Sequence, residues 1–312
     1  MPALLCTMAK VLITGGTGLI GTALIQALEN AGHQVHLLSR TASNAGGNVK
    51  RFRWSVQQGT MDPAAWQGVE HVVHLAGAGI ADKRWSTARV QELIDSRAAS
   101  ALLLLRSAKE HGVELKSFVS AAGINYYGAI TSDHVFVETD APGTDTIGRI
   151  SRDWEAAVDV WSSVCRVVKL RTPIVLSPTG GALAKLAAPV RFGLGAALGS
   201  GRQWMPWVHL DDLVRIYIEA LFDDRFNGAY NVNSGNDVTN AAFMRTIARV
   251  LHRPYVLPAV PSFVLKVALG GLSSILLEGS RASNERLLAT GYRFEHPELE
   301  AALSDLLRQQ QS

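Results

Sequence analysis

Apolar positions in the first half of the chain fall into two alternating patterns. Short and almost continuous apolar runs, such as KVLIT at 10–14 and HVVHLAG at 71–77, predict buried strands. Between them lie longer segments with apolar residues three or four positions apart, such as LIGTALIQALENAG at 19–32, which predict helices. Strands that alternate with helices are typical of a parallel sheet with right-handed crossovers. The pattern therefore predicts an α/β fold built on a parallel sheet.

The pattern changes near Thr172, where glycines become frequent and helical spacing dominates. Three further helices are predicted at 240–251, 261–277 and 297–307. We therefore predict a first domain at 8–171 and a smaller, mostly helical lobe at 172–312. Because no linker separates them, exchange of strands between the lobes is expected. Residues 1–7 are predicted to be an extension, since Met8 leads directly into the first strand.

The most apolar segment of the chain is 256–278. Two prolines, a lysine and the pair Gly270–Gly271 interrupt it, so no apolar run reaches the roughly 20 residues that a membrane span needs. A buried helix, or a helix that covers an apolar groove, is expected here instead. The sequence thus predicts no association with a membrane.

Composition and charge narrow the class of protein. The chain has 312 residues, of which 47% are hydrophobic and 18% charged, which is enough apolar material for a large core. The formal net charge is +3 and the basic residues are scattered, so nucleic-acid binding is not predicted, although an anionic cofactor or substrate would suit this balance. The two cysteines, Cys6 and Cys165, form neither a CxxC pair nor a metal-binding spacing, which indicates a reducing, cytoplasmic location.

The glycine-rich string VLITGGTGLIG at 11–21 carries the clearest chemistry. Gly16, Gly18 and Gly21 satisfy the pattern GxGxxG, and Gly15 with the last two satisfies GxxGxxG. Glycines at this spacing permit a tight turn after the strand, close approach of the backbone to a pyrophosphate, and close packing of the next helix. Because the amides and the positive end of a helix then face the ligand, the string predicts a dinucleotide site.

The second predicted strand favours NADP(H) over NAD(H). NAD-binding sites place an acidic residue about 20 residues after the glycines, but no Asp or Glu lies between Asn30 and Met61. The strand ends instead in Ser39 and Arg40, which can hydrogen-bond and pair with a 2′-phosphate. A solvated surface arginine is the alternative interpretation of Arg40.

These features together resemble the extended short-chain dehydrogenase/reductase family, the NAD(P)-dependent epimerases and dehydratases. The resemblance rests on TGGTGLIG, HVVHLAG, YYG at 126–128 and WVHLDDL at 207–213. IADKRW at 80–85, RDWEAA at 152–157 and LATGYRFEHPELEAAL at 288–303 are similar to one branch, the epimerase family proteins sometimes labelled cell-division inhibitors. The resemblance covers almost the whole chain. It implies that residues 8–171 form an NADP-binding α/β domain of the Rossmann type, with a doubly wound parallel sheet, and that residues 172–312 form a substrate-binding lobe. It also implies a monomer or a homodimer and a small-molecule substrate.

The resemblance also implies which residues contact the cofactor. These expected contacts are Gly15, Gly16, Thr17, Gly18, Leu19, Ile20, Gly21, Leu75, Ala76, Gly77, Pro173 and Val175. Glu92 and Arg97, on the predicted long helix, are expected near the nicotinamide or its ribose. A charge pair within that helix is the alternative for both.

The usual catalytic set of this family is missing. Typical members carry Tyr-x-x-x-Lys on a helix and a Ser or Thr about two dozen residues earlier. In DTIGRISRDWEAAV at 145–158 those two positions are Ile147 and Ser151, and the third falls at Ala122 or Gly123. Isoleucine cannot exchange a proton, and loss of a general acid alone lowers rates by about 10²–10⁴.

Two tyrosines are candidates for a replacement acid. Tyr126 and Tyr127 follow the end of a predicted strand, where α/β sheets place their ligands. A nearby cation would lower the pKa of either phenol from about 10. Packing with one hydrogen bond is the alternative for both tyrosines. Ser120 is a third, weaker candidate.

Several cations are candidate substrate contacts. Lys83, Arg84 and Trp85 follow another predicted strand, and a solvated loop is the alternative there. Arg191, Arg202 and Gln203 flank the glycine-rich stretch and would suit an anionic substrate.

The string HLDD at 209–212 raises the question of a metal. His209, Asp211 and Asp212 offer ligand atoms, but no further ligand cluster is apparent in the sequence. We therefore predict that the string opens a helix with an Asp as its cap, and that no metal binds.

Two functions fit these observations. The first is an NADP(H)-dependent oxidoreductase or epimerase that acts on a small, sugar-like or anionic substrate without the usual Ser/Tyr/Lys set. The second is an NADP(H)-binding regulator or redox sensor without turnover, since a fold does not fix a function.

Overall fold

An eight-stranded sheet forms the centre of the computed structural model, which describes residues 8–41 and 48–308. Its order is β11-β8-β6-β5-β1-β2-β3-β4, and every neighbouring pair is parallel except β3 and β4. The strands are β1 Lys10–Thr14, β2 Gln34–Ser39, β3 Val49–Ser55, β4 Thr60–Met61, β5 His71–His74, β6 Ser117–Gly123, β8 Arg166–Thr172 and β11 Gly228–Asn231. The predicted doubly wound fold is therefore confirmed. The predicted extension at 1–7 lies outside the described residues.

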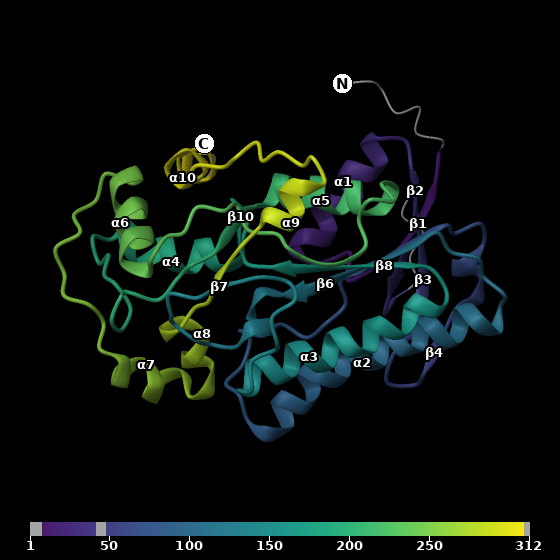
Figure 1. Cartoon of the computed structure of the whole chain (residues 1–312), viewed down its shortest axis with the longest axis horizontal. Coiled ribbons are helices and arrows are strands. Elements are labelled where there is room, and N and C mark those ends of the chain that lie inside the picture. The colour runs from purple at the N-terminus through teal and green to yellow at the C-terminus, as the bar shows by residue number, and fades with distance from the viewer. Residues whose placement is uncertain (1–7, 42–47, 309–312) are drawn as a thin grey trace.

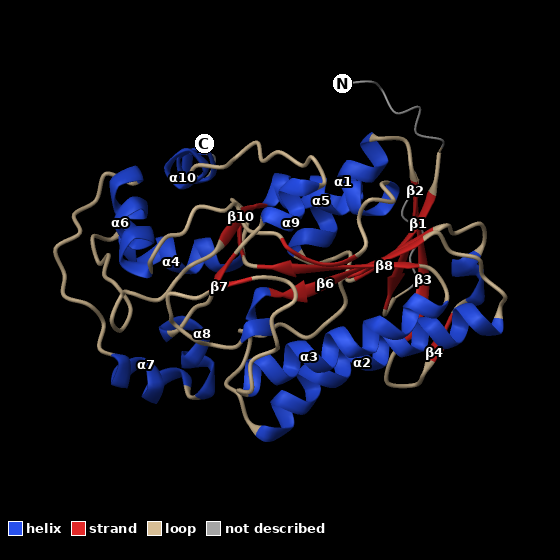
Figure 2. Cartoon of the chain, viewed as in Figure 1, coloured by secondary structure: helices blue, strands red, loops and turns tan. Residues whose placement is uncertain are grey.

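Helices cover both faces of this sheet (Figures 1 and 2). On one face α1 (Leu19–Asn30) packs against α5 (Leu210–Phe222), and on the other α2 (Thr87–Glu110) packs against α3 (Thr146–Asp159). The side chains of Ser86 and Asp145 begin α2 and α3 by accepting backbone N–H groups three residues on, as N-caps do. Ile150, Trp154 and Val158 bury the apolar stripe of α3, as their spacing predicts.

A smaller lobe lies beyond β8, on the left of Figure 1. A two-stranded parallel sheet of β9 (Ile174–Leu176) and β10 (Trp207–His209) underlies it. Around it pack α4 (Gly181–Arg191), α6 (Asn240–Val250) and α10 (Leu299–Arg308). The remaining short elements are β7 Val135–Phe136, β12 Arg281–Ala282, α9 Glu285–Ala289, η1 Pro63–Trp66, η2 Ile124–Tyr127 and η3 Val160–Ser163. Because β11 and α5 follow this lobe's first strand yet belong to the large sheet and its covering layer, the two lobes share elements of the chain.

The apolar segment at 256–278 is not one buried helix, so that expectation is wrong for its first part. Gly270, with φ of 59°, ends α7 (Ser262–Leu269), and η4 (Gly271–Ser273) and α8 (Ser274–Leu277) follow. No residue of α7 is buried, and Phe263 and Val267 are mostly exposed. The part of the segment that covers an apolar hollow, as expected, is α8, whose Ile275 and Leu276 line a cavity. Within the described part of the chain, no helix is both long and apolar enough to cross a membrane.

The segment that leads to α10 is fixed to the beginning of α5 by one buried carboxylate. Asp212 is fully buried, and its oxygens accept hydrogen bonds from the backbone N–H of Glu295 (2.8 Å) and of His296 (2.9 Å). The Tyr292 hydroxyl donates to the same carboxylate at 3.1 Å. Asp212 therefore holds the loop at 292–296 against the body of the protein.

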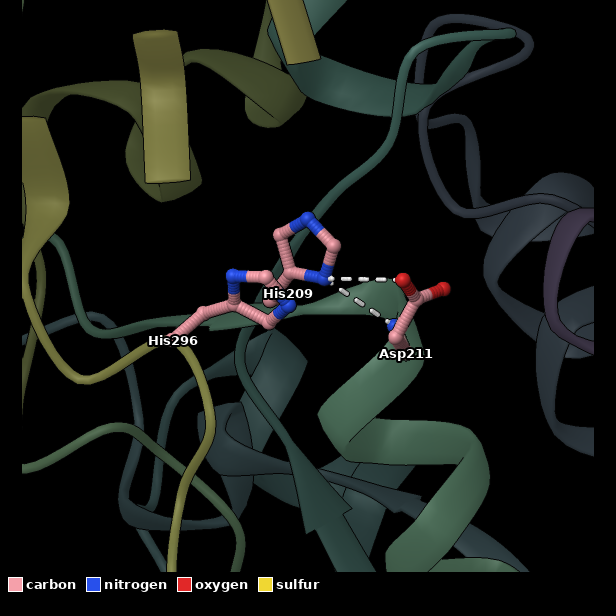
Figure 3. Close-up of side chains that lie close together, drawn as sticks. All are labelled: His209, Asp211 and His296. Atoms are coloured by element: carbon pink, nitrogen blue, oxygen red, sulfur yellow. Dashed lines mark hydrogen bonds and ion pairs between the residues drawn. The ribbon is translucent and has the colours of Figure 1, made fainter. Parts of the chain in front are cut away.

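His209, rather than an Asp, caps α5. Its Nδ1 accepts the backbone N–H of Asp211 at 3.2 Å, which corrects the prediction of an Asp cap. The His296 ring stacks on the His209 ring, with 3.8 Å between the centroids and 24° between the planes. Figure 3 shows these two rings beside the Asp211 carboxylate. His209 and Asp211 are two residues apart, whereas His296 comes from a distant part of the sequence.

Candidate functional site

The glycine loop between β1 and α1 has the backbone shape that the motif predicts. Gly15 has a φ of 71°, and a Cβ added there would lie 2.6 Å from the carbonyl group of Leu75. The Gly15 carbonyl accepts the N–H of Gly18 at 3.0 Å, which closes the turn. Gly21 lies so close beneath this turn that its Cβ would stand 2.5 Å from the Gly15 oxygen. Only glycine fits at Gly15 and Gly21 without a shift of the backbone.

At Gly18 the backbone is ordinary and the space is open. Its φ of −80° suits any residue, and an added Cβ would meet only the Gly15 oxygen, at 3.3 Å. Leu19 and Ile20 follow as the first residues of α1, whose N-terminal amides have no carbonyl partners within the helix. An open side next to a helix N-terminus is the geometry that receives a pyrophosphate.

The segment that follows β5 packs against the other side of this loop. The Thr14 hydroxyl accepts the backbone N–H groups of Leu75 (3.2 Å) and Ala76 (3.1 Å), which holds the segment after β5 against the end of β1. Gly77 then lies against Arg97, because an added Cβ would meet the guanidinium carbon at 3.0 Å. The predicted contacts 15–21 and 75–77 are therefore brought together at the carboxyl edge of the sheet.

The end of β2 carries the predicted 2′-phosphate site. Arg40 is exposed, while the Ser39 hydroxyl donates to the Thr41 carbonyl oxygen. Arg53 on β3 is the register partner of Ser39 and is also exposed. Sequence analysis missed Arg53, because only the pairing of β2 with β3 brings it next to Ser39. Two arginines thus lie at this edge, and no acidic residue occurs between Asn30 and Met61.

A cavity of about 700 Å³ opens at the carboxyl ends of β6 and β8, between the two lobes. Parallel α/β sheets bind their ligands at this edge. Asn125 follows β6, and Pro173 and Val175 follow β8, so the last two lie where cofactor contacts were predicted. The other charged or amide side chains on the wall are Asp82, Arg97, Lys185, Gln203, Asn240 and Glu278. Of these, sequence analysis identified only Arg97 and Gln203.

Arg97 faces this cavity from α2. Its Nη1 and Nη2 donate to the carbonyl oxygens of Leu93 and Ala78, each at 3.0 Å, and its guanidinium lies 4.7 Å from the Trp154 ring centroid. Burial lowers the pKa of Arg97 to about 10, so it stays charged at neutral pH. Its Nε is buried without a partner among the described groups, so the cation has unused capacity toward a ligand.

Glu92 does not join Arg97. It forms a 2.7 Å ion pair with Arg89 one turn away, and its side chain is about half exposed. The alternative of a charge pair within the helix therefore holds for Glu92, with Arg89 as the partner. Its role as a cofactor contact stays a prediction that this ion pair does not support.

Gln203 supplies an acceptor that nothing in the described protein uses. Its Nε2 donates to the carbonyl oxygens of Leu198 (2.9 Å) and Leu276 (2.7 Å), which fixes the amide. Its Oε1 is buried without a hydrogen-bond partner in the described part of the chain. A buried acceptor left alone costs about 1–3 kcal/mol, so a ligand that donates to it would be favoured.

The predicted substrate cations lie elsewhere. None of the five predicted substrate contacts is among the described residues that line the cavity. These are Lys83, Arg84, Trp85, Arg191 and Arg202. Lys83, Arg84 and Arg202 are exposed, as a solvated loop predicts, and the Trp85 indole donates to the Ile80 carbonyl at 3.0 Å. Their role as substrate contacts stays a prediction, and the cavity gives it no support.

The position of the usual catalytic tyrosine is filled by packing. Ile147 is fully buried in an apolar cluster with Leu93 and Ile150. Ile80 and Ile275 pack against the same cluster and also line the cavity. Ser151 is buried one turn further along α3. The helix thus keeps its place but presents no group that titrates at these two positions.

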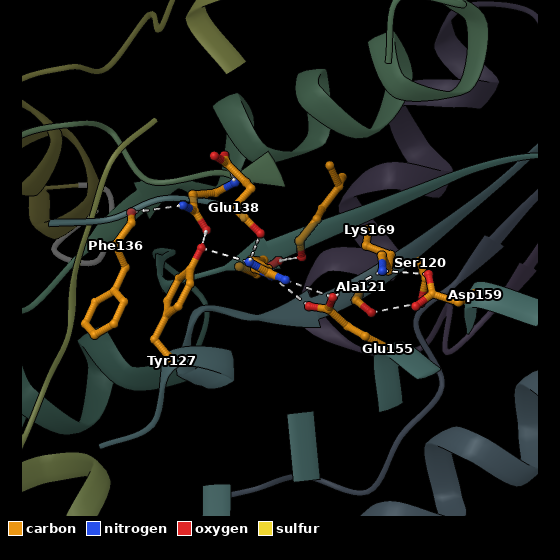
Figure 4. A network of polar contacts seen from close by, with 12 residues as sticks. Ser120, Ala121, Tyr127, Phe136, Glu138, Glu155, Asp159 and Lys169 are labelled. Carbon is orange, nitrogen blue, oxygen red and sulfur yellow. Dashed lines mark hydrogen bonds and ion pairs between the residues drawn. The ribbon is translucent and has the colours of Figure 1, made fainter. Parts of the chain in front are cut away.

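Tyr127 is part of a buried polar network (Figure 4). Its hydroxyl donates to the Asn231 amide oxygen (2.8 Å) or the Val137 carbonyl (3.1 Å), and accepts from Arg171 Nη1 at 2.8 Å. Burial, only partly offset by Arg171, raises the pKa of Tyr127 to about 12. A phenol with a raised pKa and satisfied partners has the environment of the packing alternative. The catalytic assignment of Tyr127 is corrected accordingly.

The other candidates of that region are also engaged. The ring of Tyr126 lies under the Arg171 guanidinium, 3.6 Å from its carbon, and the Ser120 hydroxyl donates to the Ala121 carbonyl at 2.8 Å. Neither Tyr126 nor Ser120 is among the described lining residues of the cavity. The structure therefore brings the cofactor loop and a cavity together without any of the predicted proton donors.

The fold and this site define a class: a dinucleotide-binding α/β protein with a smaller appended lobe. A family model described as the NAD dependent epimerase/dehydratase family matches residues 11–233, and a domain of unknown function, DUF1731, matches 260–306. The chain belongs to the NAD dependent epimerase/dehydratase family, and the resemblance seen in the sequence is confirmed.

Similar proteins extend over nearly the whole chain. An epimerase family protein of Mycobacterium tuberculosis is 38% identical over 297 residues, which are 95% of this chain and 96% of that protein. The human epimerase family protein SDR39U1 is 34% identical over 304 residues, 96% of this chain and 99% of that protein. A crystal structure of human SDR39U1 (isoform 2) with NADPH superposes with a TM-score of 0.85 at 33% identity, and covers 96% of this chain and 99% of that one. A UDP-glucose 4-epimerase of Thermus thermophilus, at 24% identity and a TM-score of 0.73, shares the fold.

Proposed function

We propose that this chain binds NADP(H) and uses it on a small substrate held in the cavity between the lobes. The open, glycine-lined loop at the N-terminus of α1 carries the proposal, because it fits a pyrophosphate and leads to the cavity wall at Arg97. The pair Ser39 and Arg40, with Arg53 beside them, supports a 2′-phosphate. The human relative was crystallised with NADPH, which agrees with this choice. Bound NADPH would supply the hydride.

The cavity indicates the kind of substrate. Its wall is largely apolar, with the cations Arg97 and Lys185, the carboxylates Asp82 and Glu278, and the free acceptor of Gln203. A small, partly apolar molecule with a hydrogen-bond donor and an anionic group would satisfy these side chains. Because α3 lacks the usual Tyr and Lys, any proton transfer would use the charged and polar side chains of the cavity wall.

A regulator without turnover is the second candidate. The packed Ile147 and the satisfied Tyr127 favour it, because apolar packing and a structural network occupy the places where a proton relay was expected. The test of turnover is NADPH oxidation, followed at 340 nm over a panel of small carbonyl compounds. If the wild type oxidises NADPH faster than an Arg97→Met variant does, the result supports the proposal that the chain is an enzyme. Saturable NADPH binding with no oxidation over the whole panel supports the regulator.

Replacing Arg40 with alanine is expected to weaken NADPH binding about 10–100-fold and to leave NADH binding unchanged. The reason is that a charge-assisted bond to the 2′-phosphate contributes about 1.5–3 kcal/mol. Fluorescence titration with both nucleotides measures this, and Arg152→Ala, which removes an exposed arginine from α3, is the control. Equal preference before and after Arg40→Ala would show that this arginine does not select the cofactor.

Replacing Ile147 with alanine is expected to lower the free energy of unfolding by about 2–4 kcal/mol, because it opens a hole in a packed cluster. NADPH affinity should change only modestly, and any NADPH-oxidising activity should persist. Leu104→Ala, at a fully buried site of another cluster, is the control for lost packing. A folded Ile147→Ala protein that binds NADPH but has lost all activity would contradict this interpretation of α3.

A further inference from the structure

The stacked histidines at the start of α5 have an arrangement that the dinucleotide site does not use. One nitrogen from each of His209 and His296 and one carboxylate oxygen of Asp211 lie within 4.8 Å of one another (Figure 3). We propose that His209, Asp211 and His296 bind a zinc-type divalent metal ion. This revises the sequence prediction of no metal, which considered His209, Asp211 and Asp212 and could not place His296 beside them.

The donor set is one that suits zinc. Two imidazoles and one carboxylate are typical ligands of Zn²⁺, with water in the remaining position. Asp211 leaves room for that water, since its side chain is 68% exposed. No lysine or arginine among the described residues pairs with it, so its charge is available to a cation.

The ligand atoms would have to move closer together to bind a tetrahedral zinc ion. With metal–ligand bonds of about 2.0–2.2 Å, two ligands of a tetrahedral zinc lie about 3.3–3.5 Å apart. His209 Nδ1 and Asp211 Oδ2 are 3.8 Å apart. The stacked ring of His296 has to turn so that its lone pair meets that of His209. His296 is only half-buried and sits in the segment between α9 and α10, which permits this rotation.

The buried side of His209 supplies a second, independent observation. His209 is 1% exposed, and its Nε2 has no hydrogen-bond partner among the described groups. The nearest acid is Asp305 on α10, whose Oδ2 is 3.9 Å from that nitrogen. Histidines that bind a metal through one nitrogen commonly direct the other N–H to a carboxylate. The pair His209 and Asp305 has this arrangement, and the metal would take the place of the Asp211 N–H that Nδ1 now accepts at 3.2 Å.

The surroundings also fix one of the ligands. Asp212 accepts the backbone N–H of His296 at 2.9 Å, so it positions this ligand without binding the ion. A metal here would join the start of α5 to the segment before α10, within the region that matches DUF1731.

The test uses the full chain after treatment with a chelator. Equilibrium dialysis against Zn²⁺ with elemental analysis should give one ion per chain, and Zn²⁺ should raise the midpoint of thermal unfolding. His296→Gln and Asp211→Asn should each weaken binding at least 10-fold and remove the thermal shift, while Asp305→Asn, a change in a positioning residue, should weaken it about 10–100-fold. His134→Gln is the matched control, since His134 forms a 2.9 Å pair with Asp140 at the surface.

Thermal unfolding without metal shows whether each variant is folded. His296→Gln and Asp211→Asn should then unfold close to the wild-type midpoint. The proposal is overturned if the wild type takes up no Zn²⁺ at 10 μM or so, a concentration at which structural zinc sites are filled. It is equally overturned if folded His296→Gln and Asp211→Asn proteins bind Zn²⁺ as the wild type does.

Discussion

Replacing Arg171 with methionine is expected to lower the free energy of unfolding by about 3–5 kcal/mol. Arg171 lies on β8 and pairs with both oxygens of Glu155 on α3, at 2.8 and 3.0 Å. It also donates to the Tyr127 hydroxyl and to the Glu138 carbonyl oxygen. Both members of the pair are almost fully buried, so the change leaves a buried carboxylate with only Lys169 as its cation, at 3.3 Å. Urea unfolding of the purified variant measures the loss.

A double substitution tests the same network more sharply. Arg171→Met combined with Glu155→Gln should recover much of the stability, because removal of both charges leaves no unpaired ion in the core. Arg152→Met, which breaks an exposed pair with Asp153, should change stability by less than about 1 kcal/mol. If Arg171→Met alone is as stable as wild type, the network does not stabilise the fold and Tyr127 becomes a candidate acid again.

Local rules are enough to predict much of the fold and the cofactor loop. The glycines at 15, 18 and 21 lie close together in the chain; Gly15 has a positive φ of 71°, and Gly21 packs directly against Gly15 and Gly16. The spacing of Ile150, Trp154 and Val158 likewise identifies the buried face of α3 from the sequence alone. In each case the physical cause operates within a few residues of chain, so the sequence displays it.

Contacts between distant segments could not be predicted in this way. Tyr127 looked like an available phenol because its partners, Arg171 and Asn231, lie far along the chain. The sequence could not show that His296 lies beside His209, because the hydrogen bond from its backbone N–H to Asp212 places it there. The lining of the cavity has the same origin, because Lys185 and Glu278 acquire their place from the packing of the second lobe.

Replacing Gly18 with valine is expected to weaken NADPH binding by about 10²–10⁴-fold while the protein still folds. The backbone at Gly18 accepts a side chain, with φ of −80° and only the Gly15 oxygen nearby at 3.3 Å. A branched side chain would fill the open space in front of the first amides of α1 and hold the pyrophosphate away. Loss of two charge-assisted hydrogen bonds, at about 1.5–3 kcal/mol each, accounts for the expected range.

Three other variants distinguish blocked binding from general damage. Ala31→Val places the same side chain at the far end of α1, at an exposed position, and should leave NADPH affinity unchanged. Gly15→Ala should instead unfold readily, because its Cβ would overlap the Leu75 carbonyl group. Gly32 also has a positive φ, but nothing lies within 4 Å of a Cβ added there. Gly32→Ala should therefore lower the free energy of unfolding only by the backbone strain, about 1–2 kcal/mol. Tight NADPH binding by a folded Gly18→Val protein would place the dinucleotide elsewhere. The open loop at Gly18 would then have no role in cofactor binding, and the proposed function would lose the observation that carries it.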